Sequence, residues 1–296
     1  MKRRERLLVL VLTRRCDRRC GFCPQGFSDA DMSEAVLDAA LEGLLPLLAA
    51  PARVKLFGGE PLLRPDLAAR ALDYLDAHAP GTPVELPTNG GGLAAAATVL
   101  ARRPGLEIFV SRPTPQAARL SGVVHNFLIP PGEPPARTAR RLLDARRMGF
   151  TRFNILPAYF VAWSSAQLEG LAAAFRGLAA VVARLEAGGR PIEIANLARA
   201  GSTPLYNDGL VVDVDGEVYS SNLALAAAVS PRRGLLRLGR AQEPGRLAAR
   251  PGAGAERVMS DSFPAEVLAS TRAVDAALTG FCLGLTPGKC AAGKRG

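Results

Sequence analysis

The sequence predicts an α/β protein in which parallel strands alternate with helices. Three observations lead to this class. Six short apolar runs recur along the first two-thirds of the chain, a segment with helical spacing follows each run, and polar, Gly-rich or Pro-rich turns connect them. With 296 residues, 48% of them hydrophobic, the chain can bury a substantial core. From the residues alone, the strands form either an open sheet or a barrel.

The elements follow one another in a regular order. We expect strands at residues 7–12, 54–57, 84–86, 107–110, 123–129 and 153–156. The helices expected after them cover residues 33–49, 65–79, 93–102, 116–120, 136–148 and 165–186. Ser33 is expected to cap the first helix, and Pro46 to kink its end. Gly149 is expected to stop the fifth helix.

The pattern changes after residue 190. Residues 191–196 read as one more strand, and "LVVDVDGEVYSS" (residues 210–221) as a hairpin that turns at Asp215–Gly216. The Pro-, Gly- and Arg-rich residues 230–257 are expected to form a long loop or mobile cover, and residues 264–278 a short helix. We therefore expect two regions, a main domain over residues 1–190 and a small α+β extension over residues 191–296.

Composition excludes several classes of protein. The net charge of +10 comes from scattered arginines, and aromatics make up only 5% of the residues, so a nucleic-acid surface is not favoured. No run reaches the roughly 18 apolar residues of a membrane span, and the apolar run near the N-terminus is too short for a signal peptide. Five cysteines, an odd number with three close together, favour a reducing, cytoplasmic setting over a disulfide framework.

The stretch "TRRCDRRCGFCPQ" (residues 13–25) follows the first strand and holds three cysteines at C-x3-C-x2-C spacing. In a loop held at both ends, three such thiolates can turn towards one point. The neighbouring arginines would favour thiolate over thiol; they are Arg14, Arg15, Arg18 and Arg19.

The number of local ligands limits what this loop can bind. A structural zinc site and an iron–sulfur cluster each normally take four protein ligands. The other candidates lie far away in the sequence and form no regularly spaced pair; they are Cys282, Cys290, His78 and His125. We expect His78 to be solvated at a helix end and His125 to be a strand residue. Three ligands thus indicate a cluster with one iron left open.

Two further motifs follow the second and third strands. Gly58-Gly59-Glu60 comes directly after the second, where glycines allow close backbone approach and a carboxylate can pair with an ammonium group. Thr88-Asn89-Gly90 comes after the third and is equally well explained as an ordinary turn. Because the carboxyl ends of parallel strands meet at one edge, these loops are expected to form one site.

Together these motifs resemble those of the radical S-adenosylmethionine (SAM) superfamily. The resemblance spans about residues 7–185 and implies a partial (β/α)6 TIM-like barrel, an α/β fold. It implies that Cys16, Cys20 and Cys23 hold one [4Fe–4S] cluster, and that SAM binds the fourth iron. In such enzymes the reduced cluster cleaves SAM to a 5′-deoxyadenosyl radical, which abstracts hydrogen from the substrate.

The resemblance also implies cofactor-binding residues. Gly58, Gly59 and Glu60 would bind the SAM amino group, and Phe22 and the backbone at Leu156 would meet the adenine. Asn89 belongs to the third-strand motif, and Ser111, at the end of the fourth strand, would contact the ribose or carboxylate. A flavodoxin or ferredoxin would supply electrons.

The C-terminal region resembles the start of a SPASM or twitch extension. Ser220 and Ser221 stand where such an extension places a cysteine ligand of an auxiliary cluster, and only Cys282 and Cys290 remain. We therefore expect a degenerate extension without an auxiliary cluster. Cys282 and Cys290 read either as a small buried residue and a loop thiol, or as a hydrogen-atom donor to a substrate radical.

Three functions remain open. A hairpin extension of this kind often accompanies peptide modification, so a peptide or peptide-like substrate is the leading hypothesis. A small-molecule substrate in cofactor or natural-product biosynthesis is the alternative within the same enzyme class. A non-catalytic zinc- or RNA-binding protein is the hypothesis from another class.

Overall fold

The computed structural model describes residues 6–49, 51–100, 103, 105–198, 208–249 and 251–285. The chain folds into two compact units. The first contains Met1–Phe109, Leu120–Gly122 and Tyr206–Phe263, and the second contains Val110–Arg119, Val123–Leu205 and Pro264–Gly296. The boundary expected at residue 190, between a main domain and a C-terminal extension, is a different division from these two units, and it stays a prediction.

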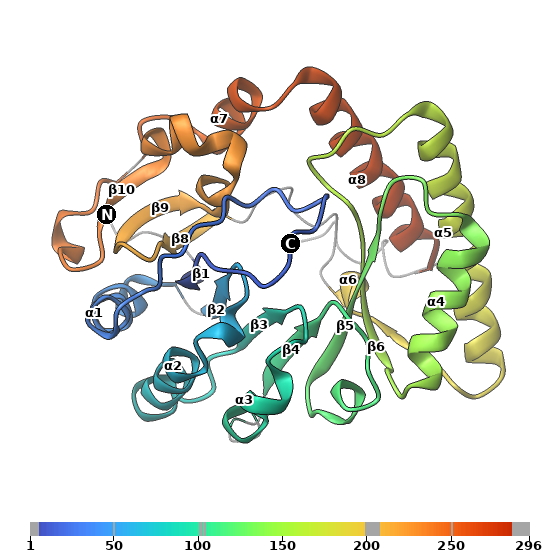
Figure 1. Ribbon diagram of the computed structural model, residues 1–296, viewed down its shortest axis with the longest axis horizontal. Helices are drawn as coiled ribbons and strands as arrows, with labels where there is room; N and C mark the ends of the chain where they lie inside the picture. Colours follow the sequence, from blue (N-terminus) through green and yellow to red (C-terminus); the bar gives the residue numbers. More distant parts are fainter. Residues whose placement is uncertain are drawn as a thin grey trace, which may run out of the picture. The chain divides into compact units, whose positions relative to one another are not determined.

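The first unit is built on a mostly parallel sheet (Figure 1). Its strands are β1 (Leu7–Thr13), β2 (Arg53–Gly58), β3 (Val84–Thr88), β4 (Leu106–Val110), β8 (Asp208–Val212), β9 (Glu217–Ser221) and β10 (Arg237–Arg240). They follow the order β10-β9-β8-β1-β2-β3-β4. β1 pairs in parallel with both β2 and β8, whereas β8–β9 and β9–β10 are antiparallel. The expected hairpin is therefore confirmed, and it is joined to the first strand.

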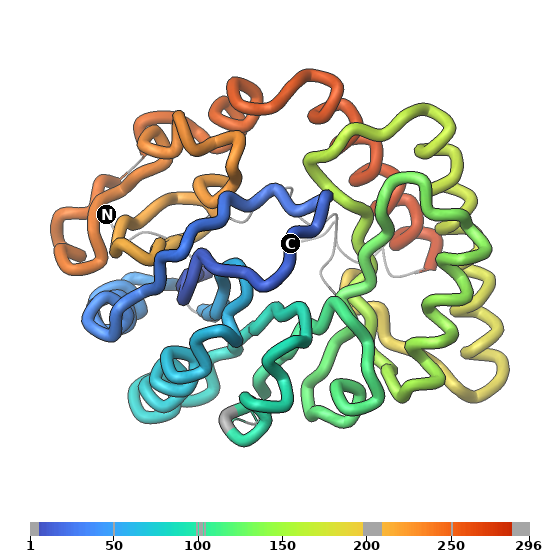
Figure 2. The backbone as a smooth tube through the Cα atoms, viewed as in Figure 1, coloured from blue at the N-terminus to red at the C-terminus, as the bar shows by residue number. Residues whose placement is uncertain are grey.

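Strand β1 forms the centre of this sheet. Every residue from Leu8 to Thr13 is buried, as expected for a parallel strand covered on both faces. Helices α1 (Glu34–Leu44), α2 (Pro65–His78) and α3 (Leu93–Leu100) lie beside strands β1 to β4. The trace in Figure 2 shows the orange hairpin running alongside the blue β1. The loop that leaves β1 is thus flanked by β2 and by the hairpin.

The second unit carries three parallel strands, β5 (Val123–Ile129), β6 (Arg152–Pro157) and β7 (Glu193–Ile194). Its helices are α4 (Pro135–Arg147), α5 (Ser165–Ala187), α6 (Ala195–Ala198) and α8 (Ala265–Leu285). Helix α5 packs against both α4 and α8 (Figure 1). The α/β class, with parallel strands and intervening helices, is confirmed.

Most element ends match the sequence signals. Ser33 caps α1 by accepting a hydrogen bond from the Val36 amide, and Gly149 follows the end of α4 with a φ of 112°. Pro46 has a stronger effect than a kink, because α1 stops at Leu44 and a short 3₁₀ turn, Leu45–Leu47, replaces its last turn. The helix expected at residues 116–120 is only a 3₁₀ turn, Ala117–Arg119.

The C-terminal region is more ordered than expected. Residues 230–257 contain the edge strand β10, two 3₁₀ segments (Ala227–Leu236 and Pro244–Arg246) and the start of α7 (Ala255–Ser262), so the expectation of one long loop was wrong. Helix α8 also runs seven residues beyond the predicted end, to Leu285. None of the helices in the described part of the chain has the length and apolar content needed to cross a membrane.

Candidate functional site

The segment that we call the cysteine loop, residues 14–31, is tied at both ends. The Arg14 amide donates to the Ala30 carbonyl over 2.8 Å, and the Ser28 amide donates to the Arg14 carbonyl over 3.3 Å. The Thr13 hydroxyl donates to the Asp31 carboxylate over 2.5 Å, and Thr13 and Asp31 also form a backbone bridge. The loop therefore starts and ends at one point, as a loop held at both ends should.

Cys16, Cys20 and Cys23 lie along this loop. Cys16 and Cys23 are half-buried and Cys20 is exposed, and the Cys23 amide closes a turn onto the Cys20 carbonyl over 3.0 Å. Burial raises the pKa of Cys23, and the negative charges of Cys20 and Cys16 raise it further. The three sulfurs are thus near enough to interact, although within the described residues no three ligating side chains already surround a common point.

The loop arginines do not act on the thiols as the sequence suggested. The Arg14 guanidinium pairs with Asp213 at 2.6 Å, and that of Arg15 pairs with Asp31 at 2.6 Å. Arg19 donates to the Cys16 carbonyl and lies over the Phe27 ring, 4.6 Å from its centre. The expectation that these arginines favour thiolate was wrong for Cys23, because burial and its two neighbours dominate.

The two glycines at the end of β2, Gly58 and Gly59, are required by close approach to Thr13 and to the start of the cysteine loop. The Gly59 amide donates to the Thr13 carbonyl over 2.9 Å, and the Glu60 amide donates to the Arg15 carbonyl over 2.8 Å. A Cβ at Gly58 would lie 2.4 Å from the Thr13 carbonyl oxygen, and one at Gly59 would lie 2.2 Å from that of Arg15. The pairing of β1 with β2 therefore continues into the cysteine loop only because both residues lack a side chain.

Glu60 connects the second loop with the third. Its carboxylate is 1% exposed and accepts hydrogen bonds from the Leu62 amide, the Thr88 hydroxyl and the Asn89 amide, at 3.0, 2.7 and 2.6 Å. Burial raises the pKa of Glu60; these donors oppose the rise, and the nearby Asp17 adds to it. The sequence singled out Glu60, but the three donors that orient it come from the fold.

Asp17 is a site residue that sequence reasoning missed. It lies between the first two cysteines, and its Oδ1 accepts a 2.6 Å hydrogen bond from the Asn89 side-chain amide. The third loop is therefore tied to the cysteine loop as well as to Glu60. A carboxylate between two metal-type ligands is the only local signal that could have identified it. Asp17 and Glu60 thus place two carboxylates at this edge of the sheet.

Several predicted residues lie in the second unit. Ser111 directly follows β4 and is exposed, while Leu156 is half-buried in β6 opposite Leu128 of β5. The Asn196 side chain holds the backbone of Ile155, the residue before Leu156. It accepts a hydrogen bond from the Ile155 amide at 2.6 Å and donates one to the Ile155 carbonyl at 2.9 Å. Asn196 was not predicted, since it becomes adjacent only through the fold.

His78 and His125 behave as ordinary structural residues. His78 is exposed at the end of α2, and His125 is buried in β5, where its Nδ1 lies 2.9 Å from the Val110 carbonyl. Both match their expectations. Cys282 is half-buried in α8, and burial raises its pKa to about 11. Cys290 lies outside the described residues.

Ser220 and Ser221 end strand β9. Ser221 is fully buried, and its hydroxyl accepts a 3.2 Å hydrogen bond from the Leu223 amide, which caps the 3₁₀ turn Asn222–Leu225. Ser221 thus has a structural task at the position where the family pattern suggested a cysteine.

The donor set fits an iron–sulfur cluster bound by three cysteines. Thiolates are the protein ligands of such clusters, and Cys16 and Cys20 lie near enough to Cys23, on one short loop, for their charges to act on its thiol. The Arg18 Nε, between Cys16 and Cys20, is buried and has no hydrogen-bond partner in the described structure. A cationic donor without a partner, on the loop that carries the three thiols, suits an anionic thiolate-bound centre.

Comparison with known families decides the class of this protein. Residues 10–157, half of the chain, match the model of the radical SAM superfamily. The chain belongs to the radical SAM superfamily of enzymes. This membership implies SAM and a [4Fe–4S] cluster as cofactors, and the strands and helices described above are consistent with the partial TIM-like barrel that was expected. A search of the curated proteins finds no match.

Solved radical SAM structures share the fold at low sequence identity. anSMEcpe with bound AdoMet matches with a TM-score of 0.62 and 14% identity over 90% of this chain and 80% of that one. The same protein with AdoMet and the Kp18Cys peptide matches with a TM-score of 0.61 and 14% identity, over 97% and 86% of the two chains. Streptococcus suis SuiB bound to the precursor peptide SuiA matches with a TM-score of 0.52 and 14% identity, over 72% and 58%.

Proposed function

We propose that this radical SAM enzyme holds one [4Fe–4S] cluster on Cys16, Cys20 and Cys23 and abstracts hydrogen from a peptide or peptide-like substrate. The observation that carries the cofactor assignment is the joining of three loops at the ends of β1, β2 and β3. Backbone hydrogen bonds connect the cysteine loop to Gly59 and Glu60, and Glu60 and Asp17 connect these to Asn89. Thiols, carboxylates and close-packed glycines thus share one edge.

When bound, the cluster and SAM supply the reductive cleavage that generates a 5′-deoxyadenosyl radical. The residues of this chain bind and orient the two groups. Glu60 has acceptor capacity beyond its three hydrogen bonds, because a carboxylate has about four lone-pair sites. Its buried charge favours a cationic partner, which the SAM amino group provides. Gly58 and Gly59 keep Glu60 close to the cysteines.

Other contacts follow from the family resemblance and are part of the proposal. Phe22 and the backbone at Leu156 would contact the adenine, and Ser111 the ribose or carboxylate. The C-terminal hairpin would be a degenerate SPASM or twitch extension that holds no second cluster, with Ser221 as a cap. A flavodoxin or ferredoxin would reduce the cluster, and Cys282 or Cys290 would return a hydrogen atom to the substrate radical.

The peptide assignment is supported by the solved structures of the same fold. anSMEcpe and SuiB were each solved with a bound peptide, and both share this fold with a TM-score above one half. The hairpin β8–β9, which flanks the cysteine loop in the first unit, is the feature that first suggested a peptide substrate.

The cofactor assignment is tested by anaerobic reconstitution with iron and sulfide. The protein reduced with dithionite is expected to release 5′-deoxyadenosine from SAM, and Cys20→Ala to release none. Gly21→Ala is the matched control, because it lies on the same loop and a Cβ there would meet nothing within 4 Å. A colourless protein with stoichiometric zinc, or a reduced protein that leaves SAM intact, would contradict the proposal.

The substrate class is tested with fractions of a cell extract. Size separation gives a peptide fraction and a metabolite fraction, and each is added to the reduced enzyme with SAM. We expect the peptide fraction alone to accelerate 5′-deoxyadenosine formation above the uncoupled rate, and protease treatment of that fraction to abolish the effect. Stimulation by the metabolite fraction instead would establish the small-molecule alternative.

A further inference from the structure

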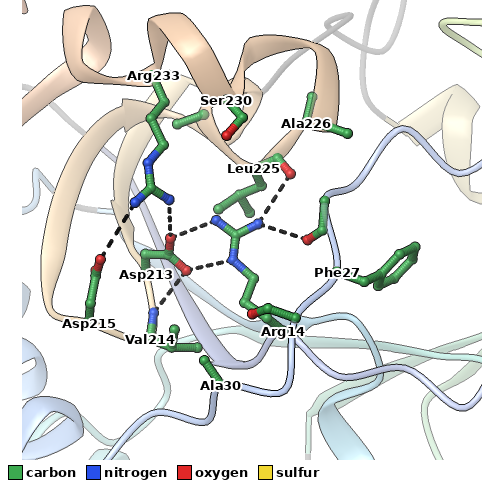
Figure 3. A pocket seen from close by; sticks show the side chains of 14 residues that line it. Arg14, Phe27, Ala30, Asp213, Val214, Asp215, Leu225, Ala226, Ser230 and Arg233 are labelled. Atoms are coloured by element: carbon green, nitrogen blue, oxygen red, sulfur yellow. Dashed lines mark hydrogen bonds and ion pairs between the residues drawn. The ribbon is translucent and has the colours of Figure 1, made fainter.

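One buried arginine joins the cysteine loop to the C-terminal hairpin. Arg14, two residues before the first cysteine, is 7% exposed, and its partner Asp213 is 1% exposed. The Arg14 Nε and Nη2 donate to the two carboxylate oxygens of Asp213 at 2.8 and 2.6 Å (Figure 3). This is a bidentate pair, the strongest geometry for such a contact. It connects residues 199 positions apart.

The same guanidinium also donates hydrogen bonds to the backbone of the cysteine loop and to the backbone that follows the hairpin. Its Nη1 donates to the carbonyl of Gly26, in the cysteine loop, and to that of Leu225, after the hairpin, each at 3.2 Å. Figure 3 shows Leu225 on one side of the guanidinium and Asp213 on the other. Arg14 therefore connects the start of the loop, its part just after the third cysteine and the hairpin at once.

Backbone hydrogen bonds reinforce this connection next to the third cysteine. The Gly26 amide donates to the Leu225 carbonyl over 2.9 Å, and the Ala227 amide donates over 2.8 Å to the carbonyl of Pro24, the residue after Cys23. Gln25 and Ala226 form an isolated antiparallel bridge. The residues after Cys23 thus lie along residues 225–227, which begin at the last residue of the 3₁₀ turn that Ser221 caps.

Asp213 is itself held in place by several contacts. Besides Arg14, it accepts from the Val214 amide at 2.9 Å and lies 3.4 Å from Arg233, whose half-exposed guanidinium also reaches Asp215. A buried ion pair is a poor source of net stability but defines one arrangement, because either partner alone is an uncompensated charge. Such a pair suits a loop that must have a single shape.

We propose that Arg14 and Asp213 are positioning residues, through which the C-terminal hairpin sets the geometry of the cysteine loop that receives the cluster. The inference rests on the proposed function only in taking that loop as the cluster site. The hairpin then contributes no ligand to the cluster. It influences the cluster by holding the cysteine loop through the Arg14–Asp213 salt bridge and through backbone hydrogen bonds.

The test measures how firmly the protein holds iron. Asp213→Asn keeps the shape of the side chain and removes its charge, and Glu217→Gln is the matched control. Glu217 lies on β9 of the same hairpin and pairs with Arg237 and Arg240, away from the loop. After reconstitution, iron release to a chelator should be about 10–100-fold faster in Asp213→Asn than in the parent, the range by which loss of a hydrogen-bond partner of a metal ligand lowers metal affinity, and unchanged in Glu217→Gln.

Two further readouts separate positioning from folding. In the protein without iron, trypsin should cut after Arg18 and Arg19 faster in Asp213→Asn than in the control. The electron paramagnetic resonance spectrum of the reduced cluster should change in Asp213→Asn and not in Glu217→Gln. Arg14→Lys keeps the charge but loses the fork, and it should show the same changes if Asp213→Asn fails to fold.

The outcomes distinguish this inference from the proposed function. If the parent protein takes up no cluster, the proposed function fails. If the parent takes it up, and both Asp213→Asn and Arg14→Lys keep its iron-release rate and its spectrum, the positioning role is overturned and the proposed function stands.

Discussion

Gly59→Ala is the substitution whose effect the structure defines most sharply. A Cβ at this position would lie 2.2 Å from the carbonyl oxygen of Arg15 and 2.6 Å from its carbonyl carbon. Carbon–oxygen contacts settle at about 3.3–3.6 Å, so the two segments must separate by roughly 1 Å. Both clashing atoms belong to the backbone, so no side-chain rotation relieves them. Arg15 directly precedes Cys16, and the shift therefore reaches the first cysteine.

This displacement has two measurable consequences. Overpacking of this kind costs about 1–3 kcal/mol, which should lower the free energy of unfolding in urea by that amount. A misplacement of about 1 Å at a reacting centre can lower a rate by about 10²-fold, which is the loss we expect in 5′-deoxyadenosine formation. The assay is anaerobic turnover of SAM with dithionite, with iron content measured on the same samples.

Gly21→Ala is the control for this experiment. Gly21 lies on the same loop, between Cys20 and Phe22, and a Cβ there would meet nothing within 4 Å. It should unfold and react like the parent protein. Equal rates and equal urea midpoints for Gly59→Ala and Gly21→Ala would show that the contact with Arg15 does not set the position of the cysteine loop.

Three further predictions concern other parts of the chain. Burial among aromatic rings lowers the pKa of His125 from 6.5 to about 4. Between these two pH values the unfolded protein binds a proton that the folded protein does not. The free energy of unfolding should therefore fall by up to about 3 kcal/mol as the pH drops through this window. Urea midpoints across the window should change less in His125→Leu, and equal slopes would contradict this. Burial raises the pKa of Cys282 to about 11, so iodoacetamide should modify this thiol slowly at neutral pH and faster as the pH rises. Peptide mass mapping would detect the modification, and rapid modification at neutral pH would refute this prediction. Ser33→Ala should cost about 1 kcal/mol in urea unfolding through loss of the α1 cap, and an unchanged midpoint would show that this cap contributes nothing.

The fold could be predicted well where the signals are local. The strand at residues 123–129 has the expected bounds, because its β-branched and aromatic residues favour a buried parallel strand even with His125 and Asn126 inside it. The edge strand β10 could not be found this way. Its sequence, Arg-Leu-Gly-Arg, has one apolar residue that is buried, and it is held by pairing with β9 and by Glu217, which contacts both Arg237 and Arg240. These partners are set by the fold.

The candidate site shows the same division. The cysteine spacing and the Gly-Gly-Glu segment identified the loops, because close approach and ligand chemistry restrict residue type at fixed positions. The partners of these residues were not predictable. The glycines approach the backbone of the cysteine loop itself, and the Glu60 carboxylate is oriented by Thr88 and Asn89. A sequence shows which residue types a site needs, but not which of them contact one another.

The arginines of the cysteine loop show why charge is hard to interpret from sequence. Arg14 and Arg15 precede the first cysteine, and proximity in sequence suggested that they stabilise thiolates. In the structure each faces a carboxylate, Asp213 or Asp31, so its charge is used to shape the loop. Burial raises the pKa of Cys23, and the negative charges of Cys20 and Cys16 raise it further. A loop built in this way needs its charge balanced by what the thiolates bind, which is what an iron cluster does.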